Sequence, residues 1–95
     1  MEEINLATRV IWKYVLNMVG TTKIQMPIGA LFLSVGNQHE TLTLWVLHDK
    51  SSVHETRRIQ TVMTGEEVNL STNDSFLGTV PFDNGNFIVH VFEKG

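Results

Sequence analysis

Four histidines are the residues of this 95-residue chain that most readily take part in chemistry: His39, His48, His54 and His90. A zinc site needs three or four ligands that converge on one ion, and no two of these histidines share a short ligand spacing. We therefore expect no metal and no cofactor. His90 differs from the others because it lies among apolar residues of a predicted strand. It is either a half-buried, hydrogen-bonded histidine or a contact for a ligand or partner.

The other nucleophiles and acids form no catalytic pattern. The chain has no cysteine, which excludes thiol catalysis, thiolate metal sites and disulfide bonds. No serine lies in a Gly-x-Ser-x-Gly elbow, and no glycines have the spacing of a phosphate-binding loop. The acidic pair Glu66-Glu67 lies in a predicted loop, where water solvates both carboxylates and neither is set up for acid–base catalysis. The sequence therefore predicts a protein that is not an enzyme.

A few cationic and aromatic side chains suit binding rather than catalysis. Arg57 and Arg58 are adjacent, so on a strand they point to opposite faces. One of them can bind a carboxylate or phosphate, although solvation or a surface ion pair is the plainer interpretation. Trp12, Tyr14 and Trp45 are expected in the core, with base stacking in a groove as the alternative. The candidate ligand-binding residues are His90, Lys13, Arg57 and Trp45.

The charge balance disfavours a polyanionic partner. The net charge is −3, with seven Lys and Arg residues and no basic run, whereas proteins that bind duplex nucleic acid carry a basic face. A local cationic spot for one small anion is still compatible with this composition. The N-terminus is acidic and no apolar run approaches 18 residues, so we expect neither a signal peptide nor a transmembrane helix. A cytoplasmic protein without membrane or duplex nucleic-acid partners is predicted.

Short alternating segments must position these side chains. Apolar residues recur with a period of two, and no window of 11 or more residues keeps a helical period. Seven segments are predicted as strands: residues 9–16, 22–26, 30–35, 42–47, 56–63, 76–80 and 86–93. We expect one all-β domain over residues 9–95, a small antiparallel β-sandwich or barrel with little or no helix. A polar N-terminal extension over residues 1–8 precedes it.

The last two predicted strands are joined by the best turn in the chain, Asp83-Asn84-Gly85-Asn86, because Asn and Gly accept positive φ at low cost. A two-residue or a four-residue loop gives the same facing pairs. Pro81 favours the four-residue loop, since it has no N–H to pair with Ile88. Thr79 then faces His90 as a non-hydrogen-bonded backbone pair with close side chains.

The final strand, residues 86–93, is apolar on both faces, so each face needs cover from a second sheet or a second chain. The chain is short and weakly charged, and it carries more bulky apolar side chains than one small core hides. A symmetric dimer meets this need, because two-fold assemblies are the commonest. Ligand binding is then expected at or near the subunit contact, with His90, Lys13 and Arg57 as polar contacts.

Several pieces of the sequence, taken in order, resemble a family of small bacteriophage-encoded proteins. The pieces are Ile11-Trp12-Lys13-Tyr14, Met26-Pro27-Ile28-Gly29-Ala30, Leu33-Ser34-Val35, Leu44-Trp45-Val46-Leu47, Thr64-Gly65, Phe76-Leu77-Gly78-Thr79-Val80 and His90-Val91-Phe92-Glu93. Members of that family usually begin at the equivalent of Ile11, which marks residues 1–8 as an extension. They often carry a histidine where this chain has Glu66, so the resemblance does not bring a ligand role to that loop.

The resemblance implies a context rather than a chemistry: a phage gene product that acts in a bacterial cytoplasm. We expect a non-enzymatic accessory or anti-defence factor that captures a host protein or a small nucleotide signal by stoichiometric binding. The alternative is a small structural component of the virion, in the tail or the head.

Overall fold

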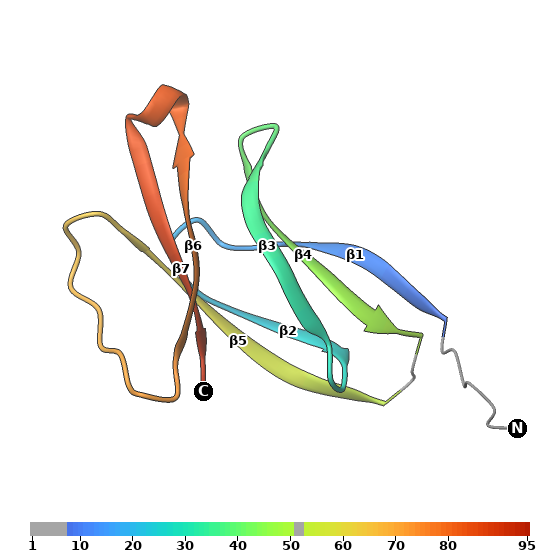
Figure 1. Ribbon diagram of the computed structural model, residues 1–95. Coiled ribbons are helices and arrows are strands. Elements are labelled where there is room, and N and C mark those ends of the chain that lie inside the picture. The colour runs from blue at the N-terminus through green and yellow to red at the C-terminus, as the bar shows by residue number, and fades with distance from the viewer. Residues whose placement is uncertain (1–7, 51–52) are drawn as a thin grey trace, which may run out of the picture.

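The computed structural model describes residues 8–50 and 53–95, which form seven β-strands and one short 3-10 turn (Figure 1). The elements are β1 Arg9–Val15, β2 Gly20–Pro27, β3 Leu31–Gln38, β4 Thr41–Asp49, β5 His54–Met63, β6 Ser75–Phe82, η1 Asp83–Gly85 and β7 Phe87–Lys94. All seven predicted strands are present. Residues 1–7 of the expected N-terminal extension lie outside the described residues.

The strands form two antiparallel sheets that pack face to face. A three-stranded sheet has the order β1-β4-β3, and a four-stranded sheet has the order β2-β5-β7-β6. At one side of the sandwich β3 packs against β6, and Figure 1 shows the β3–β4 and β6–β7 hairpins side by side there. The alternating pattern predicts this architecture, and of the two alternatives it leaves open the sandwich is the one found.

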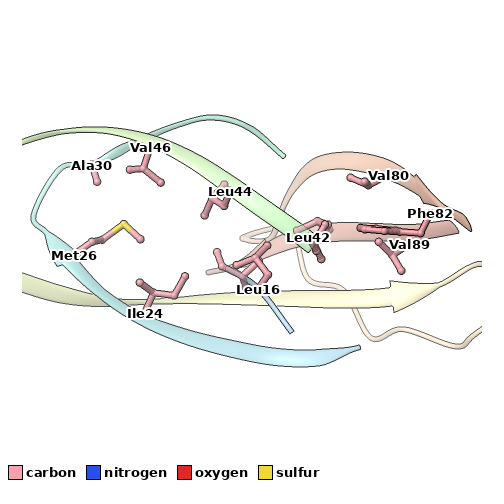
Figure 2. Close-up of a cluster of buried hydrophobic side chains, with 12 residues drawn as sticks. Leu16, Ile24, Met26, Ala30, Leu42, Leu44, Val46, Val80, Phe82 and Val89 are labelled. Carbon is pink, nitrogen blue, oxygen red and sulfur yellow. The ribbon is translucent and has the colours of Figure 1, made fainter. Parts of the chain in front are cut away.

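The core lies between the sheets and is built from alternate residues of the central strands (Figure 2). Leu42, Leu44 and Val46 of β4 are 0% exposed, as are Val89 and Val91 of β7. This alternation follows from the period of two, because successive side chains on a strand point to opposite faces. Each such side chain contributes about 1.5–3 kcal/mol by its burial, so β4 and β7 supply the centre of the hydrophobic stabilisation.

Two turns show how local sequence sets the strand ends. The turn after β2 has Gly29 at φ 83°, and the Ala30 N–H donates to the Pro27 carbonyl over 3.2 Å, which suits the preference of Pro and Gly for such turns. The next turn is shorter than the gap between the predicted strands 30–35 and 42–47. There β3 continues to Gln38, and His39 and Glu40 form a two-residue turn with φ of 52° and 60°.

Side-chain hydrogen bonds explain this tighter turn. The Glu40 N–H donates to Asn37 Oδ1 over 2.7 Å, and the Glu40 carboxylate accepts the Asp83 N–H over 3.2 Å from the neighbouring hairpin. Left-handed backbone at two non-glycine residues is unfavourable, so these contacts hold a conformation that the local sequence does not favour. The local sequence of one segment cannot predict a contact between two hairpins.

The C-terminal hairpin has the predicted register. Phe82 pairs with Phe87, and Thr79 pairs with His90. The connection has four residues, 83–86, and its first three have positive φ. The side chains of the Thr79–His90 pair are close, as predicted, because Thr79 Oγ1 lies 2.9 Å from His90 Nδ1.

Thr61 on β5 provides a stability test of the core. It is 0% exposed, and its Oγ1 has no hydrogen-bond partner within residues 8–50 and 53–95. Thr61→Val should raise the free energy of unfolding by about 1–2 kcal/mol, because valine has the same shape without a hydroxyl that burial leaves unpaired. Urea denaturation measures this change.

The matched control is Thr43→Val. Thr43 is 1% exposed, but its hydroxyl donates to the Thr41 carbonyl over 3.1 Å. This substitution should give no gain in stability, since it removes a hydrogen bond that is made. Equal gains from both variants would contradict the assigned cause.

Candidate functional site

The outer face of the three-stranded sheet is unusually apolar. Residues paired directly across antiparallel strands share a face, and here Ile11, Leu47 and Leu31 form one row across β1, β4 and β3. Lys13 and Trp45 pair in the next row. The outer face of a sandwich normally carries polar side chains, yet Ile11 is 59% exposed, Val15 63% and Leu31 55%. We call this surface the Trp45 face: Ile11, Lys13, Val15, Leu31, Trp45 and Leu47.

Neighbouring residues fix the two side chains at its centre. The Trp45 indole lies against Gly36 of β3, where a Cβ would come within 3.2 Å of ring atom Cζ3. A larger residue at position 36 would therefore crowd the ring. Lys13 starts on β1, and its Nζ donates to Gln38 Oε1 on β3 over 2.8 Å. The lysine side chain thus crosses over β4 and brings a positive charge beside the indole.

A hollow of about 360 Å³ opens at this place, lined by Ile11, Trp12, Lys13 and Trp45. Small-molecule sites have volumes of about 300–1,000 Å³, so the hollow is large enough for a small ligand. The Trp45 indole can stack on a flat ring, while the Lys13 ammonium can bind an anionic group. This combination of an aromatic surface and one cation suits a flat, negatively charged molecule or an aromatic and acidic segment of a protein.

Trp12 was not among the candidate residues, and the expectation that it packs in the core is wrong. Its side chain is 58% exposed, because β1 is an edge strand of its sheet. Tyr14, on the same strand face, does pack against the core. The alternation along β1 indicates which residues share a face, but it does not show where the opposite sheet ends.

His90 lies on the outer face of the other sheet. Its Nε2 lies 2.7 Å from Thr64 Oγ1, and its Nδ1 lies 2.9 Å from Thr79 Oγ1. Both ring nitrogens therefore have hydrogen-bond partners, and the side chain is half-buried. This is the hydrogen-bonded arrangement that the sequence offers as one of two alternatives.

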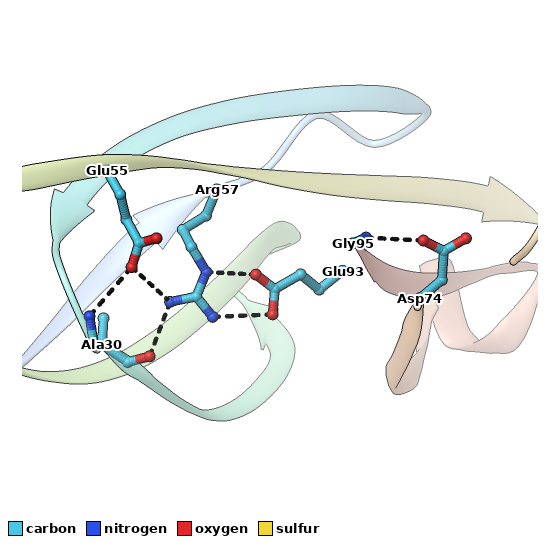
Figure 3. Close-up of polar contacts among 7 residues, drawn as sticks. Ala30, Glu55, Arg57, Asp74, Glu93 and Gly95 are labelled. Atoms are coloured by element: carbon cyan, nitrogen blue, oxygen red, sulfur yellow. Dashed lines mark hydrogen bonds and ion pairs between the residues drawn. The ribbon is translucent and has the colours of Figure 1, made fainter. Parts of the chain in front are cut away.

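Arg57 lies between the sheets (Figure 3). Its side chain is 17% exposed, and its guanidinium binds both carboxylate oxygens of Glu93, with Nη2 donating to Oε1 over 2.9 Å. It also donates to the Ala30 carbonyl over 2.9 Å and stacks on the Phe32 ring at 4.2 Å. The hydrogen bonds to Glu93 raise the pKa of Arg57, against the opposing effect of burial. Arg57 is an internal link between strands.

The four candidate residues are thus divided among three places. The structure brings Lys13 and Trp45 together and places His90 and Arg57 elsewhere. The residues that sequence reasoning missed are Trp12, Ile11 and Leu31. One sequence feature could have identified Ile11 as a residue of this surface. Ile11, Lys13 and Val15 share one face of β1, so that two apolar side chains flank a cation there.

Comparison with known families adds one finding. Residues 7–95 match the family described as Domain of unknown function (DUF7352). The chain belongs to this family. The match covers every strand of the sandwich, including the strands that line the hollow, and the description of DUF7352 assigns no chemistry. No curated protein and no solved structure matches the chain.

In the described part of the chain, no group of three or more His, Asp or Glu side chains is arranged to hold a metal ion. Over residues 8–50 and 53–95, no helix is long and apolar enough to cross a membrane.

Three hydrogen bonds hold the Asp74 side chain of this DUF7352 chain near the C-terminal end of β7. Its carboxylate accepts hydrogen bonds from Lys94 Nζ over 2.6 Å, the Ser71 N–H over 2.8 Å and the Gly95 N–H over 2.9 Å. Lys94 first, and then the two backbone donors, hold the pKa of Asp74 well below its ordinary value of 3.8. The Asp74–Gly95 contact appears in Figure 3 and ties the end of β7 to the long β5–β6 connection.

This contact predicts a dependence of stability on pH. Because the pKa of Asp74 is lower in the folded than in the unfolded state, its contribution is fully present above about pH 5 and is lost as the pH falls through and below about 4. Asp74→Asn should lower stability at pH 7 and flatten the loss of stability between about pH 5 and pH 2. Urea denaturation at several pH values measures both effects.

Glu67→Gln is the control, since Glu67 is exposed and lies in the same connection. It should leave the acid dependence of stability close to that of the wild type. An acid dependence that stays unchanged in Asp74→Asn would contradict the role assigned to Asp74.

Proposed function

We propose that this chain is a non-enzymatic binding protein that captures a host protein or a small nucleotide signal through the Trp45 face. The observation that carries the proposal is the apolar outer face of the three-stranded sheet, with the hollow beside Lys13 and Trp45. Large exposed apolar patches on soluble domains mark interaction sites. A side chain such as Trp45 is the kind of anchor that dominates binding energy at protein interfaces.

The polar part of the same face supports an anionic group on the ligand. Lys13 is exposed, and of its three ammonium donors one is used by Gln38. Two donors are left for a phosphate or carboxylate. A nucleotide would place its base against the Trp45 indole and its phosphate at Lys13. His90 and Arg57 are not part of this proposed site, because His90 lies on the outer face of the other sheet and Arg57 lies between the sheets.

The biological context of the proposal comes from the resemblance to small phage proteins. Trp12, Lys13 and Trp45 all belong to the sequence pieces that carry this resemblance. In that context the protein is an accessory or anti-defence factor, made by a phage and acting in the host cytoplasm. Capture by a small domain without catalysis requires about one copy for each target molecule.

Self-association belongs to the same proposal. Ile88 and Phe92 of the last strand are half-buried in the single chain, whereas Ile11, Val15 and Leu31 are each more than half exposed. A two-fold dimer that joins two Trp45 faces would cover these residues and place the hollow at the subunit contact. Sedimentation should give about twice the 10.7 kDa of the chain, and Leu31→Glu should give the monomer. A wild-type monomer at high micromolar concentration would remove the dimer.

Intrinsic fluorescence offers a direct test of the binding site. The chain has two tryptophans, and both line the hollow, so the emission of the protein reports on this place. Titration with a panel of mono- and dinucleotides should give saturable quenching by at least one member. Lys13→Gln should weaken that binding, whereas Arg9→Gln, which removes an exposed cation from the same strand, should not.

Affinity capture from a bacterial lysate tests the protein partner. Wild-type bait should retain a host protein that a Trp45→Ser bait loses. The proposal fails if no nucleotide changes the fluorescence and no retained protein depends on Trp45. Mass spectrometry of purified phage particles decides against the virion alternative if the chain is absent, and in its favour if the chain is present at a structural copy number.

A further inference from the structure

We propose that the outer face of the four-stranded sheet binds single-stranded nucleic acid, at a surface separate from the Trp45 face. Two adjacent rows of side chains carry this proposal. One row is cationic and the other contains a pair of aromatic rings. Each row runs across neighbouring strands, perpendicular to them.

The cationic row joins Lys23 of β2, Arg58 of β5 and Lys94 of β7. Lys23 pairs directly with Arg58, and Arg58 pairs directly with Lys94. Like charges directly opposite each other destabilise a sheet. Lys23 and Arg58 are both exposed, and neither side chain makes a hydrogen bond or ion pair with the part of the chain that the structure describes. An anion bound between them would remove this repulsion.

The acidic groups near this row are already engaged. Asp74 binds Lys94 over 2.6 Å. Glu55 and Glu93 lie on the inner side of their strands, where both face Arg57. The net charge of −3 is therefore unevenly distributed. It disfavours a polyanion as an average over the molecule, yet this face presents two uncompensated cations.

The second row lies two residues along the strands from the cationic row. Gln60 pairs with Phe92, and Phe92 pairs with Phe76. The two phenyl rings are 5.4 Å apart between centroids, and Phe76 is 60% exposed. Two residues along a strand span about 7 Å, so the rings lie beside the cations. Gln60 adds an amide that can hydrogen-bond to a base edge.

Together the rows match the chemistry of a single strand. Successive bases stack on aromatic rings, and a cationic surface binds the phosphates. Bases within a duplex are already stacked and paired, so they cannot use the phenyl rings. With strands about 4.8 Å apart, the three-strand cationic row spans roughly 10 Å, which corresponds to a few nucleotides. We therefore expect weak binding that depends on salt and tolerates different sequences.

Fluorescence anisotropy with a labelled ten-nucleotide oligothymidylate tests the proposal. At 50 mM salt the wild type should bind saturably. The double variant Lys23→Gln/Arg58→Gln should bind at least about ten-fold more weakly, and the slope of log affinity against log salt should fall by about 1.4, at about 0.7 for each phosphate contact on a single strand. Phe76→Ser should weaken binding at least about five-fold and leave the salt slope unchanged.

Three further measurements test the proposal. Arg9→Gln removes one positive charge from the other sheet and should alter the affinity less than two-fold. The thermal midpoint of Lys23→Gln should rise by about 1–3 °C, because the repulsion with Arg58 is relieved. The matching duplex should bind at least about five-fold more weakly than the single strand. A loss in Arg9→Gln equal to that in the double variant, equal binding of the duplex, or no binding of the single strand would each overturn the proposal, whatever the outcome at the Trp45 face.

Discussion

Replacing Arg57 with methionine should lower the free energy of unfolding by about 3 kcal/mol, the lower end of the range for breaking a buried ion pair. The value is at the lower end because Arg57 is 17% and Glu93 22% exposed, so water screens part of the interaction. Methionine keeps much of the side-chain volume between the sheets. The loss therefore comes from the Glu93 carboxylate, which is left without its charged partner, and from the Ala30 carbonyl, which loses a donor. Urea denaturation at pH 7 measures the change.

A double-mutant cycle identifies the cause. Glu93→Gln alone should also destabilise the protein, because it leaves the half-buried arginine charge with only its longer contact to Glu55. The double variant Arg57→Met/Glu93→Gln should lose less stability than the two single variants added together, since it removes both charges of the Arg57–Glu93 pair. Additive losses would show that stacking of the guanidinium on Phe32, rather than the ion pair, dominates.

The second large effect is expected at Gly78. This glycine of β6 faces Val35 of β3, and a Cβ at position 78 would lie 2.7 Å from Val35 Cγ2. Valine is stiff at χ1, so the clash can be relieved only if the sheets move apart at this side of the sandwich. Gly78→Ala should therefore lower the free energy of unfolding by about 1–3 kcal/mol, the usual cost of overpacking a core.

The test of this steric explanation is a rescue. Val35→Ala removes the methyl groups that an alanine at position 78 would meet. Gly78→Ala introduced into a Val35→Ala background should cost less than about 1 kcal/mol, because the two smaller side chains share the space. If Gly78→Ala costs the same in both backgrounds, backbone conformation rather than contact with Val35 explains the need for glycine.

Local pattern was sufficient to predict most of the fold. The alternation along residues 42–47 places Leu42, Leu44 and Val46 on one face of β4, and the structure buries that face. The Asp83–Asn86 turn with Pro81 predicts the register of the C-terminal hairpin, and Thr79 pairs with His90 as expected. Such features depend on residues a few positions apart, where the period of a strand and the φ preferences of turn residues decide the outcome.

The candidate site could be predicted only in part, because its geometry depends on which sheets and strands become neighbours. Both faces of β4 are apolar, so the sequence does not tell which of them lies outside. Lys13 and Trp45 come together because β1 pairs with β4, and Arg57 turns inward because β5 pairs with β7 opposite the turn at Ala30. Neither pairing leaves a signal within one segment of sequence.

The order of strands in the two sheets also affects how the chain emerges from the ribosome. β1 pairs with β4, and about 25 residues separate the end of β1 at Val15 from the start of β4 at Thr41. At roughly 5–20 residues synthesised per second, β1 is unpaired for about 1–5 s before synthesis of its partner strand begins. β2 is unpaired for about as long, because about 26 residues separate it from the start of its partner β5. During translation the Ile11–Val15 edge, which carries half of the Trp45 face, is therefore an unpaired apolar strand that a chaperone or a second nascent chain can reach.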